Sequence, residues 1–135
     1  MTKKFLTNID IEIQVFTPIF PSESVSKVIE AINLVMGMKI DLDHTNNFLL
    51  GTTNKKEVLI NTYDQIRNRS VTSVFNRLLI SNLNQNTTWF YINKQAATEG
   101  LIVLVEKFLE SPLGPIKISL TSENILQVIE FLSFE

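Results

Sequence analysis

Residue types that commonly carry catalysis are scarce in this 135-residue sequence. Cysteine is absent, which excludes disulfides, thiolate nucleophiles and cysteine-based metal sites. The single histidine, His44, falls in a predicted hairpin turn, and no Gly-x-Ser-x-Gly segment accompanies it. We therefore expect no nucleophilic triad and predict that the protein is not an enzyme.

Phosphate-binding and metal-binding motifs are also missing. Asp41-Leu42-Asp43 opens like a calcium loop, but Asn46 and Thr52 stand where that loop needs its glycine and glutamate. Asp10 and Glu12 share one face of a predicted strand, where they can serve acid–base chemistry or simply form its solvated side. The glycines are too scattered for a Walker loop or a dinucleotide fingerprint, at Gly37, Gly51, Gly100 and Gly114. We predict no metal and no cofactor.

Three segments carry side chains that suit nucleic-acid binding. Aromatic rings in Trp89-Phe90-Tyr91 can stack on bases if the strand face is open, or can fill the core. The guanidinium groups of Arg67 and Arg69, with Arg77 nearby, can bind phosphates or lie along a solvated helix. The turn Asn93-Lys94-Gln95 offers hydrogen-bond donors and an acceptor, or caps its own backbone.

Strands and helices predicted from hydrophobic periodicity must position these segments. Alternation in residues 8–16 is typical of a half-buried strand, and helical spacing after Ser22 predicts an amphipathic helix that ends at Gly37. The apolar stripe of a second helix continues past Ser70, which predicts either one bent helix or two. The further predicted strands are residues 38–42, 48–51, 88–92, 101–105 and 116–120, and a final helix follows Ser122.

The predicted order is β-α-β-β-α(α)-β-β-β-α, with no repeat and no linker. Short hairpin connections favour a single α+β domain, residues 1–135, with a largely antiparallel sheet and helices packed on one face. A hydrophobic fraction of 44% fits a folded domain, and the sequence shows no export signal or membrane span, so we expect a cytoplasmic protein. The net charge of −2 argues mildly against a nucleic-acid binder, although residues 65–98 are locally basic.

Four segments give the chain a resemblance to a known family. Tyr91-Ile92-Asn93-Lys94-Gln95-Ala96-Ala97, followed by Gly100 and Ser111-Pro112-Leu113-Gly114-Pro115-Ile116, resembles two motifs of the archaeal uncharacterised protein family two-oh-one. Pro21-Ser22-Glu23-Ser24 and Arg67-Asn68-Arg69 are similar to two less specific segments of that family. The resemblance spans nearly the whole chain.

The resemblance implies a fold like that of the ribosomal protein that binds five-S RNA, related to double-stranded-RNA-binding domains and often dimeric. It implies RNA binding, with double-stranded or structured RNA as the expected partner, and no established activity. Carried over position by position, the residues expected to contact RNA are Arg67, Arg69, Asn93, Lys94 and Gln95.

The chain also departs from the family pattern. Thr72-Ser73-Val74-Phe75 lacks the charges that family members carry there, and Leu101 replaces a basic residue. These losses leave an alternative open, a homodimeric protein-interaction module that binds no nucleic acid. The apolar segments Leu101–Val105 and Phe131–Phe134 favour that alternative, because exposed apolar surface is normally covered by a partner.

Overall fold

The fold is an antiparallel sheet backed by helices, which confirms the predicted α+β class. A computed structural model describes residues 5–134. Its six strands are ordered β2-β3-β1-β6-β4-β5, and all pairs are antiparallel. The strands are β1 (Glu12–Pro18), β2 (Asp43–Thr45), β3 (Phe48–Thr53), β4 (Thr87–Ile92), β5 (Leu104–Val105) and β6 (Ile116–Thr121). The helices are α1 (Val25–Met36), α2 (Ile60–Asn68), α3 (Thr72–Ser81), α4 (Lys94–Ala97) and α5 (Ile125–Ser133), with 3₁₀ turns η1 (Lys56–Leu59) and η2 (Phe108–Glu110).

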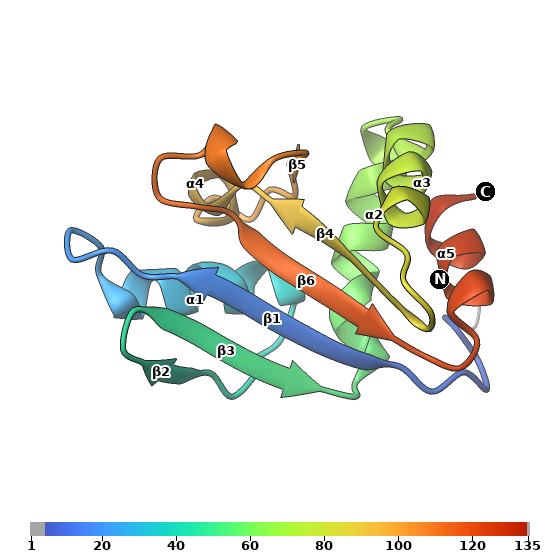
Figure 1. The fold of residues 1–135 in the computed structure, drawn as a ribbon, viewed down its shortest axis with the longest axis horizontal. Coiled ribbons are helices and arrows are strands. Elements are labelled where there is room, and N and C mark those ends of the chain that lie inside the picture. Colours follow the sequence, from blue (N-terminus) through green and yellow to red (C-terminus); the bar gives the residue numbers. More distant parts are fainter. Residues whose placement is uncertain (1–4, 135) are drawn as a thin grey trace.

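Helices cover one face of the sheet and leave the other uncovered. In Figure 1 the sheet faces the viewer, and α1 and α2 pass behind it. Burial follows the pleat, since Ile13, Phe90 and Ile118 point into the core and are at most 1% exposed. Their neighbours along the strands point the other way and stay accessible. We call this side the open face, and its side chains include those of Glu12, Gln14, Phe16, Phe48, Trp89, Tyr91, Lys117 and Ser119.

Local interactions determine where helix α1 begins and ends. The hydroxyl of Ser24 accepts a hydrogen bond from the Lys27 amide at 3.4 Å, so the N-cap is Ser24 and not the predicted Ser22. At the other end Gly37 has φ of 73°, a left-handed conformation that glycine adopts at little steric cost. The predicted stop at Gly37 is confirmed.

The helical segment around Ser70 consists of two helices, a point that the sequence left open. Helix α2 ends at Asn68, and Ser70 adopts φ of 58°. That conformation is unfavourable for a residue with a Cβ and cannot continue a right-handed helix. The chain therefore turns, and α3 packs Phe75 edge-on against Phe90 with ring centroids 4.9 Å apart.

The first hairpin and the last helix start later than predicted. Strand β2 is Asp43–Thr45 and not residues 38–42, and Asn46 in its turn takes φ of 52°, which asparagine tolerates. Asn124, not Ser122, directly precedes α5. The Ser122 hydroxyl instead accepts a hydrogen bond from the Asn124 amide at 3.0 Å, so it forms a turn ahead of the helix.

The predicted strand at residues 101–105 is reduced to β5. Gln65 of α2 explains this, because its side chain donates to the Gly100 carbonyl at 2.8 Å and accepts from the Ile102 amide at 2.7 Å. These bonds hold residues 100–102 against α2 and away from the sheet. The short helix α4 is an addition to the predicted order. Within residues 5–134, no helix combines the length and apolar character needed to cross a bilayer.

Candidate functional site

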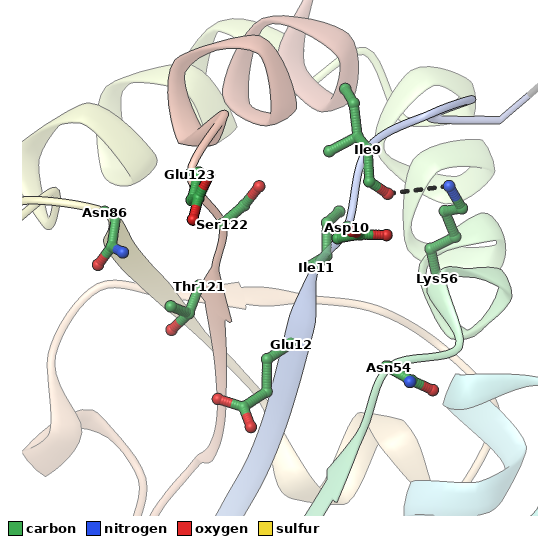
Figure 2. Close-up of a pocket in the computed structure, with 10 residues that line it drawn as sticks. All are labelled: Ile9, Asp10, Ile11, Glu12, Asn54, Lys56, Asn86, Thr121, Ser122 and Glu123. Carbon is green, nitrogen blue, oxygen red and sulfur yellow. Dashed lines mark hydrogen bonds between the residues drawn. The ribbon is translucent and has the colours of Figure 1, made fainter.

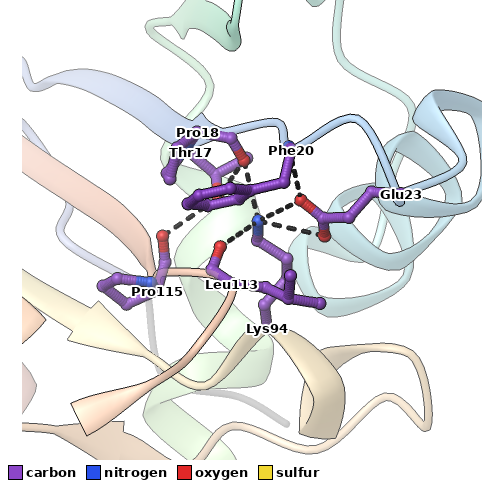
Figure 3. Close-up of polar contacts among 7 residues, drawn as sticks. All are labelled: Thr17, Pro18, Phe20, Glu23, Lys94, Leu113 and Pro115. Carbon is purple, nitrogen blue, oxygen red and sulfur yellow. Dashed lines mark hydrogen bonds and ion pairs between the residues drawn. The ribbon is translucent and has the colours of Figure 1, made fainter. Parts of the chain in front are cut away.

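Lys94, which we predicted to contact RNA, is buried (Figure 3). Its side chain is 3% exposed, and its ammonium donates to the carbonyl oxygens of Pro18 at 2.7 Å and Leu113 at 2.6 Å. The same nitrogen forms an ion pair with Glu23 at 3.0 Å, and the Glu23 side chain is 7% exposed. A lysine ammonium has three protons, and these acceptors occupy all three. Lys94 thus ties three distant segments together.

We call Lys94, Glu23 and the carbonyls of Pro18 and Leu113 the Lys94 junction. It joins three of the segments that carried the family resemblance. Glu23 comes from the Pro-Ser-Glu-Ser segment, and Leu113 from the Pro-Leu-Gly-Pro segment. Burial lowers the pKa of Lys94, while the hydrogen bond and the charge of Glu23 oppose that shift. A buried ion pair is tolerated when its remaining hydrogen-bonding capacity is satisfied, as it is here.

Asn93 and Gln95, the residues on either side of Lys94, have different surroundings. Asn93 accepts a hydrogen bond from the Ala96 amide at 2.8 Å and so caps the start of α4. The turn therefore stabilises its own backbone, one of the two alternatives that the sequence left open. Gln95 is exposed and lines a pocket of about 210 Å³ together with Lys27 and Thr98.

Arg67 is held against the C-terminal helix. Its guanidinium carbon lies 3.5 Å from the centroid of the Tyr63 ring. Its nitrogens donate to the carbonyl oxygens of Phe131 and Leu132, both at 3.0 Å, and to that of Phe134. Carbonyls at the end of a helix lack intrahelical donors and carry partial negative charge. Arg67 supplies donors to them and so fixes the end of α5 to α2.

The remaining arginines of the predicted basic segment lie at the surface. Arg69 is exposed at the C-terminal end of α2. Arg77 pairs with Glu106 at 3.0 Å, but both side chains are more than half exposed, so this pair contributes little. Figure 1 shows α4 and the α2–α5 region at opposite ends of the sheet. The predicted contact residues therefore do not converge, because Arg67 and Lys94 face different parts of the interior.

Aromatic side chains of β4 divide between the core and the open face. Phe90 is 1% exposed and belongs to the core. Trp89 and Tyr91 point to the open face, where their ring centroids lie 4.7 Å apart at an interplanar angle of 51°. Phe90 thus fills the core, while Trp89 and Tyr91 lie on the open face.

Lys117 of β6 lies beside these rings. It pairs with Tyr91 in the sheet register, and its ammonium lies 4.7 Å from the centroid of the Trp89 ring. The ring of Phe108, from η2, approaches Tyr91 edge-on with centroids 6.0 Å apart. Burial raises the pKa of Tyr91 above its usual value. We call Trp89, Tyr91 and Phe108 the Trp89 cluster.

A second aromatic pair lies on the other side of Lys117. Phe16 of β1 and Phe48 of β3 have ring centroids 5.3 Å apart at 37°. Phe16 pairs with Lys117 across the β1–β6 ladder, just as Tyr91 does across the β4–β6 ladder. Lys117 is therefore bracketed by the Trp89 cluster and by this Phe16 cluster, formed by Phe16 and Phe48.

Comparison with known proteins places the chain among archaeal relatives. No family model matches it. A UPF0201 protein of Sulfurisphaera tokodaii is 30% identical over 131 residues, which cover 95% of this chain and 88% of the relative. The chain belongs to the UPF0201 family. A UPF0201 protein of Methanothermobacter thermautotrophicus is 29% identical over 122 residues, covering 90% of each chain, and the predicted family is thereby confirmed.

Solved UPF0201 structures share the fold. A crystal structure of an uncharacterized UPF0201 protein matches with a TM-score of 0.78 at 23% identity, covering 92% of this chain and 94% of that one. The UPF0201 protein from Methanococcus jannaschii matches with a TM-score of 0.75, also at 23% identity, covering 92% and 93% of the two chains. At this identity the likeness shows the fold of UPF0201 proteins and leaves the function to be argued from the site.

A larger cavity of this UPF0201 chain lies at the ends of β1 and β6 (Figure 2). It has a volume of about 380 Å³, and Asp10, Glu12 and Glu123 are in its wall. The side chains of Asp10 and Glu12 point away from each other, so they do not form the acid–base pair that their spacing allowed. The ammonium of Lys56 donates to the carbonyl of Ile9 at 2.9 Å. Within the described part of the chain, no group of three or more histidine or acidic side chains is placed to hold a metal.

Sequence analysis did not single out Lys117, Phe16 or Phe48 of this UPF0201 chain. A usable signal was present, because residues of β1 and β6 alternate between the core and the open face. What the sequence alone did not give is the strand order that places β6 between β1 and β4. That order brings Lys117 between two aromatic clusters.

Proposed function

We propose that this UPF0201 chain is a non-catalytic RNA-binding protein that uses the open face of its sheet. The observation that carries the proposal is the group formed by Trp89, Tyr91 and Lys117, two partly accessible rings beside an ammonium on the sheet face that no α-helix within residues 5–134 covers. RNA-binding modules with aromatic residues on an open sheet face stack them on unpaired bases, and nearby cations meet the phosphates. The expected ligand is therefore an unpaired segment, such as a loop or an end, of a structured RNA.

The Lys117 ammonium lies over the Trp89 ring, so it competes with an RNA base for that ring. A cation over an aromatic ring at an exposed site contributes about 0.5–1 kcal/mol. Stacking of a base on an aromatic side chain contributes about 1–3 kcal/mol. The base therefore displaces the ammonium from the ring, and the flexible Lys117 side chain is then free to pair with a phosphate of the same RNA.

The proposal predicts a shallow salt dependence. One phosphate contact to single-stranded nucleic acid gives a slope of about −0.7 in log affinity against log salt concentration. A surface of Arg67, Arg69 and Lys94 would give a steeper slope, but Arg67 and Lys94 are occupied by partners within the chain. We expect a slope near that of one contact, because stacking supplies most of the affinity.

Fluorescence anisotropy with a labelled 12-nucleotide single-stranded RNA tests the proposal. We expect Trp89→Ala and Tyr91→Ala each to weaken binding at least about fivefold, from the range for base stacking. Phe134→Ala is the matched control, because it removes an exposed phenylalanine at the end of α5, away from the open face. A perfect duplex of the same sequence should bind more weakly. Equal affinity of both open-face variants and the parent would reject the proposal.

Arg69 and Gln95, which the sequence predicted to contact RNA, are exposed. We keep them as predicted additional contacts with RNA. They lie off the open face, so their contribution should be smaller than that of Trp89. An Arg69→Ala/Gln95→Ala double variant measured with the same RNA checks this. A larger loss than that of Trp89→Ala would move the binding surface away from the sheet.

A second candidate function is the homodimeric interaction module. The observation that favours it is Leu109, which is 91% exposed next to the Trp89 cluster, and an apolar side chain there suits a protein partner. Light scattering at high protein concentration tests this candidate with Leu109→Asp as the variant. A dimer that dissociates in Leu109→Asp would favour the interaction module, and a monomer in both would remove it.

A further inference from the structure

The two aromatic clusters of the open face lie on opposite sides of a single cation. Trp89 and Tyr91 belong to β4 and Phe16 to β1, with β6 and its Lys117 between them. Neighbouring strands lie about 4.8 Å apart, so β1 and β4 are separated by about 9.6 Å. A single base that stacks on Tyr91 does not extend across this distance to stack on Phe16 as well.

We propose that the open face binds a dinucleotide step of single-stranded RNA, with one base on each aromatic cluster and the phosphate between them at Lys117. This inference rests on the proposed RNA binding and specifies the smallest ligand that uses the whole surface. The register supports it, because Tyr91, Lys117 and Phe16 stand directly opposite one another in adjacent strands and all point to the same side.

Half-buried rings in both clusters keep part of their surface accessible. Trp89 and Tyr91 contact each other, and Phe16 contacts Phe48, yet all four side chains keep part of their surface accessible. Lys117 is likewise partly accessible, and its ammonium already lies over the Trp89 ring. In the proposed complex Lys117 swings away from that ring and pairs with the phosphodiester that links the two stacked bases.

A comparison of uridine monophosphate with the dinucleotide UpU tests the inference, since each carries one phosphate and they differ by one nucleoside. NMR titration with both ligands reports the Trp89 indole and the phenylalanine rings separately. We expect UpU to perturb both clusters and to bind at least about fivefold more tightly than the mononucleotide, from the range for stacking one base. The mononucleotide should perturb the Trp89 cluster more than the Phe16 cluster.

Substitutions in the Phe16 cluster test whether the higher affinity of UpU over the mononucleotide comes from that cluster. Phe16→Ala and Phe48→Ala should each lower the affinity for UpU toward that of the mononucleotide, and should lower the affinity for the mononucleotide by a smaller factor. Phe134→Ala serves as the matched control, and thermal unfolding confirms that each variant is folded. The two substitutions in one cluster give independent readings if either one proves unstable.

The outcomes separate this inference from the proposed function. If UpU binds no more tightly than the mononucleotide, or if both cluster variants keep the parent affinity, the dinucleotide step is wrong. RNA binding still stands in that case if Trp89→Ala weakens binding of the 12-nucleotide RNA. If neither the short ligands nor the 12-nucleotide RNA perturbs Trp89, both proposals fail.

Discussion

Replacing Lys94 by alanine should lower the free energy of unfolding by about 3–5 kcal/mol, the usual cost of removing one partner of a buried ion pair. The substitution leaves the carboxylate of Glu23, only 7% exposed, without its cation. It also removes the donor that the carbonyls of Pro18 and Leu113 share. For a domain of this size each kcal/mol corresponds to about 4 °C, so Tm should fall by roughly 12–20 °C.

Urea and thermal unfolding followed by circular dichroism measure this effect. Gln95→Ala is the matched control, because it removes the exposed neighbouring side chain and should change stability by less than about 0.5 kcal/mol. A Lys94→Met/Glu23→Leu double variant should recover much of the loss, since apolar replacement of a whole buried pair is often close to neutral.

A loss of less than about 1 kcal/mol in Lys94→Ala would refute the reasoning, because a buried ion pair with further hydrogen bonds is expected to cost more. If such a stable variant also lost RNA binding, Lys94 would be a ligand contact, as the sequence first suggested. The measurement therefore distinguishes a residue that holds the fold from a residue that holds RNA.

Three further predictions concern other parts of the chain. Arg67→Ala should destabilise by about 2–3 kcal/mol in urea unfolding, because it removes charged donors from carbonyls of α5, whereas Arg69→Ala should stay within about 0.5 kcal/mol. The pKa of Tyr91 is raised in the folded state above its usual value of about 10. Its contribution to stability is therefore present below pH 10 and lost as pH rises through the folded pKa, and tyrosinate absorbance should show a late step that Tyr91→Phe removes. If the chain is a monomer, Leu109→Ser should leave RNA affinity, light scattering and Tm almost unchanged, since Leu109 is 91% exposed.

Local patterns in the sequence predicted most of the secondary structure. The alternation around Ile13 and Val15 gave a strand, and the stripe that ends at Gly37 gave α1, because periodicity and a left-handed glycine are local properties. The strand at residues 101–105 failed for a non-local reason. Gln65 holds its first residues by hydrogen bonds that span 35 and 37 positions of the chain.

The candidate site was harder still to predict from local sequence, because its contacts join residues far apart in the chain. Lys94 sits in a polar Asn-Lys-Gln segment that is typical of a solvated turn, but its partners lie 71, 76 and 19 residues away. Arg67 likewise finds its carbonyl acceptors 64 and 65 residues away. Neither contact leaves a trace in the local pattern. The family resemblance pointed to these segments, and in the structure Lys94 and Arg67 bind carbonyl acceptors within the chain.

Intrinsic fluorescence of Trp89 gives the most direct test of binding on the open face, because the chain has a single tryptophan and it lies on that face. Titration with unlabelled single-stranded RNA should quench and shift its emission with the same midpoint as anisotropy of the labelled RNA, and Tyr91→Ala should move both midpoints together. RNA that binds by anisotropy while the emission of Trp89 stays constant would place the ligand elsewhere and contradict the account.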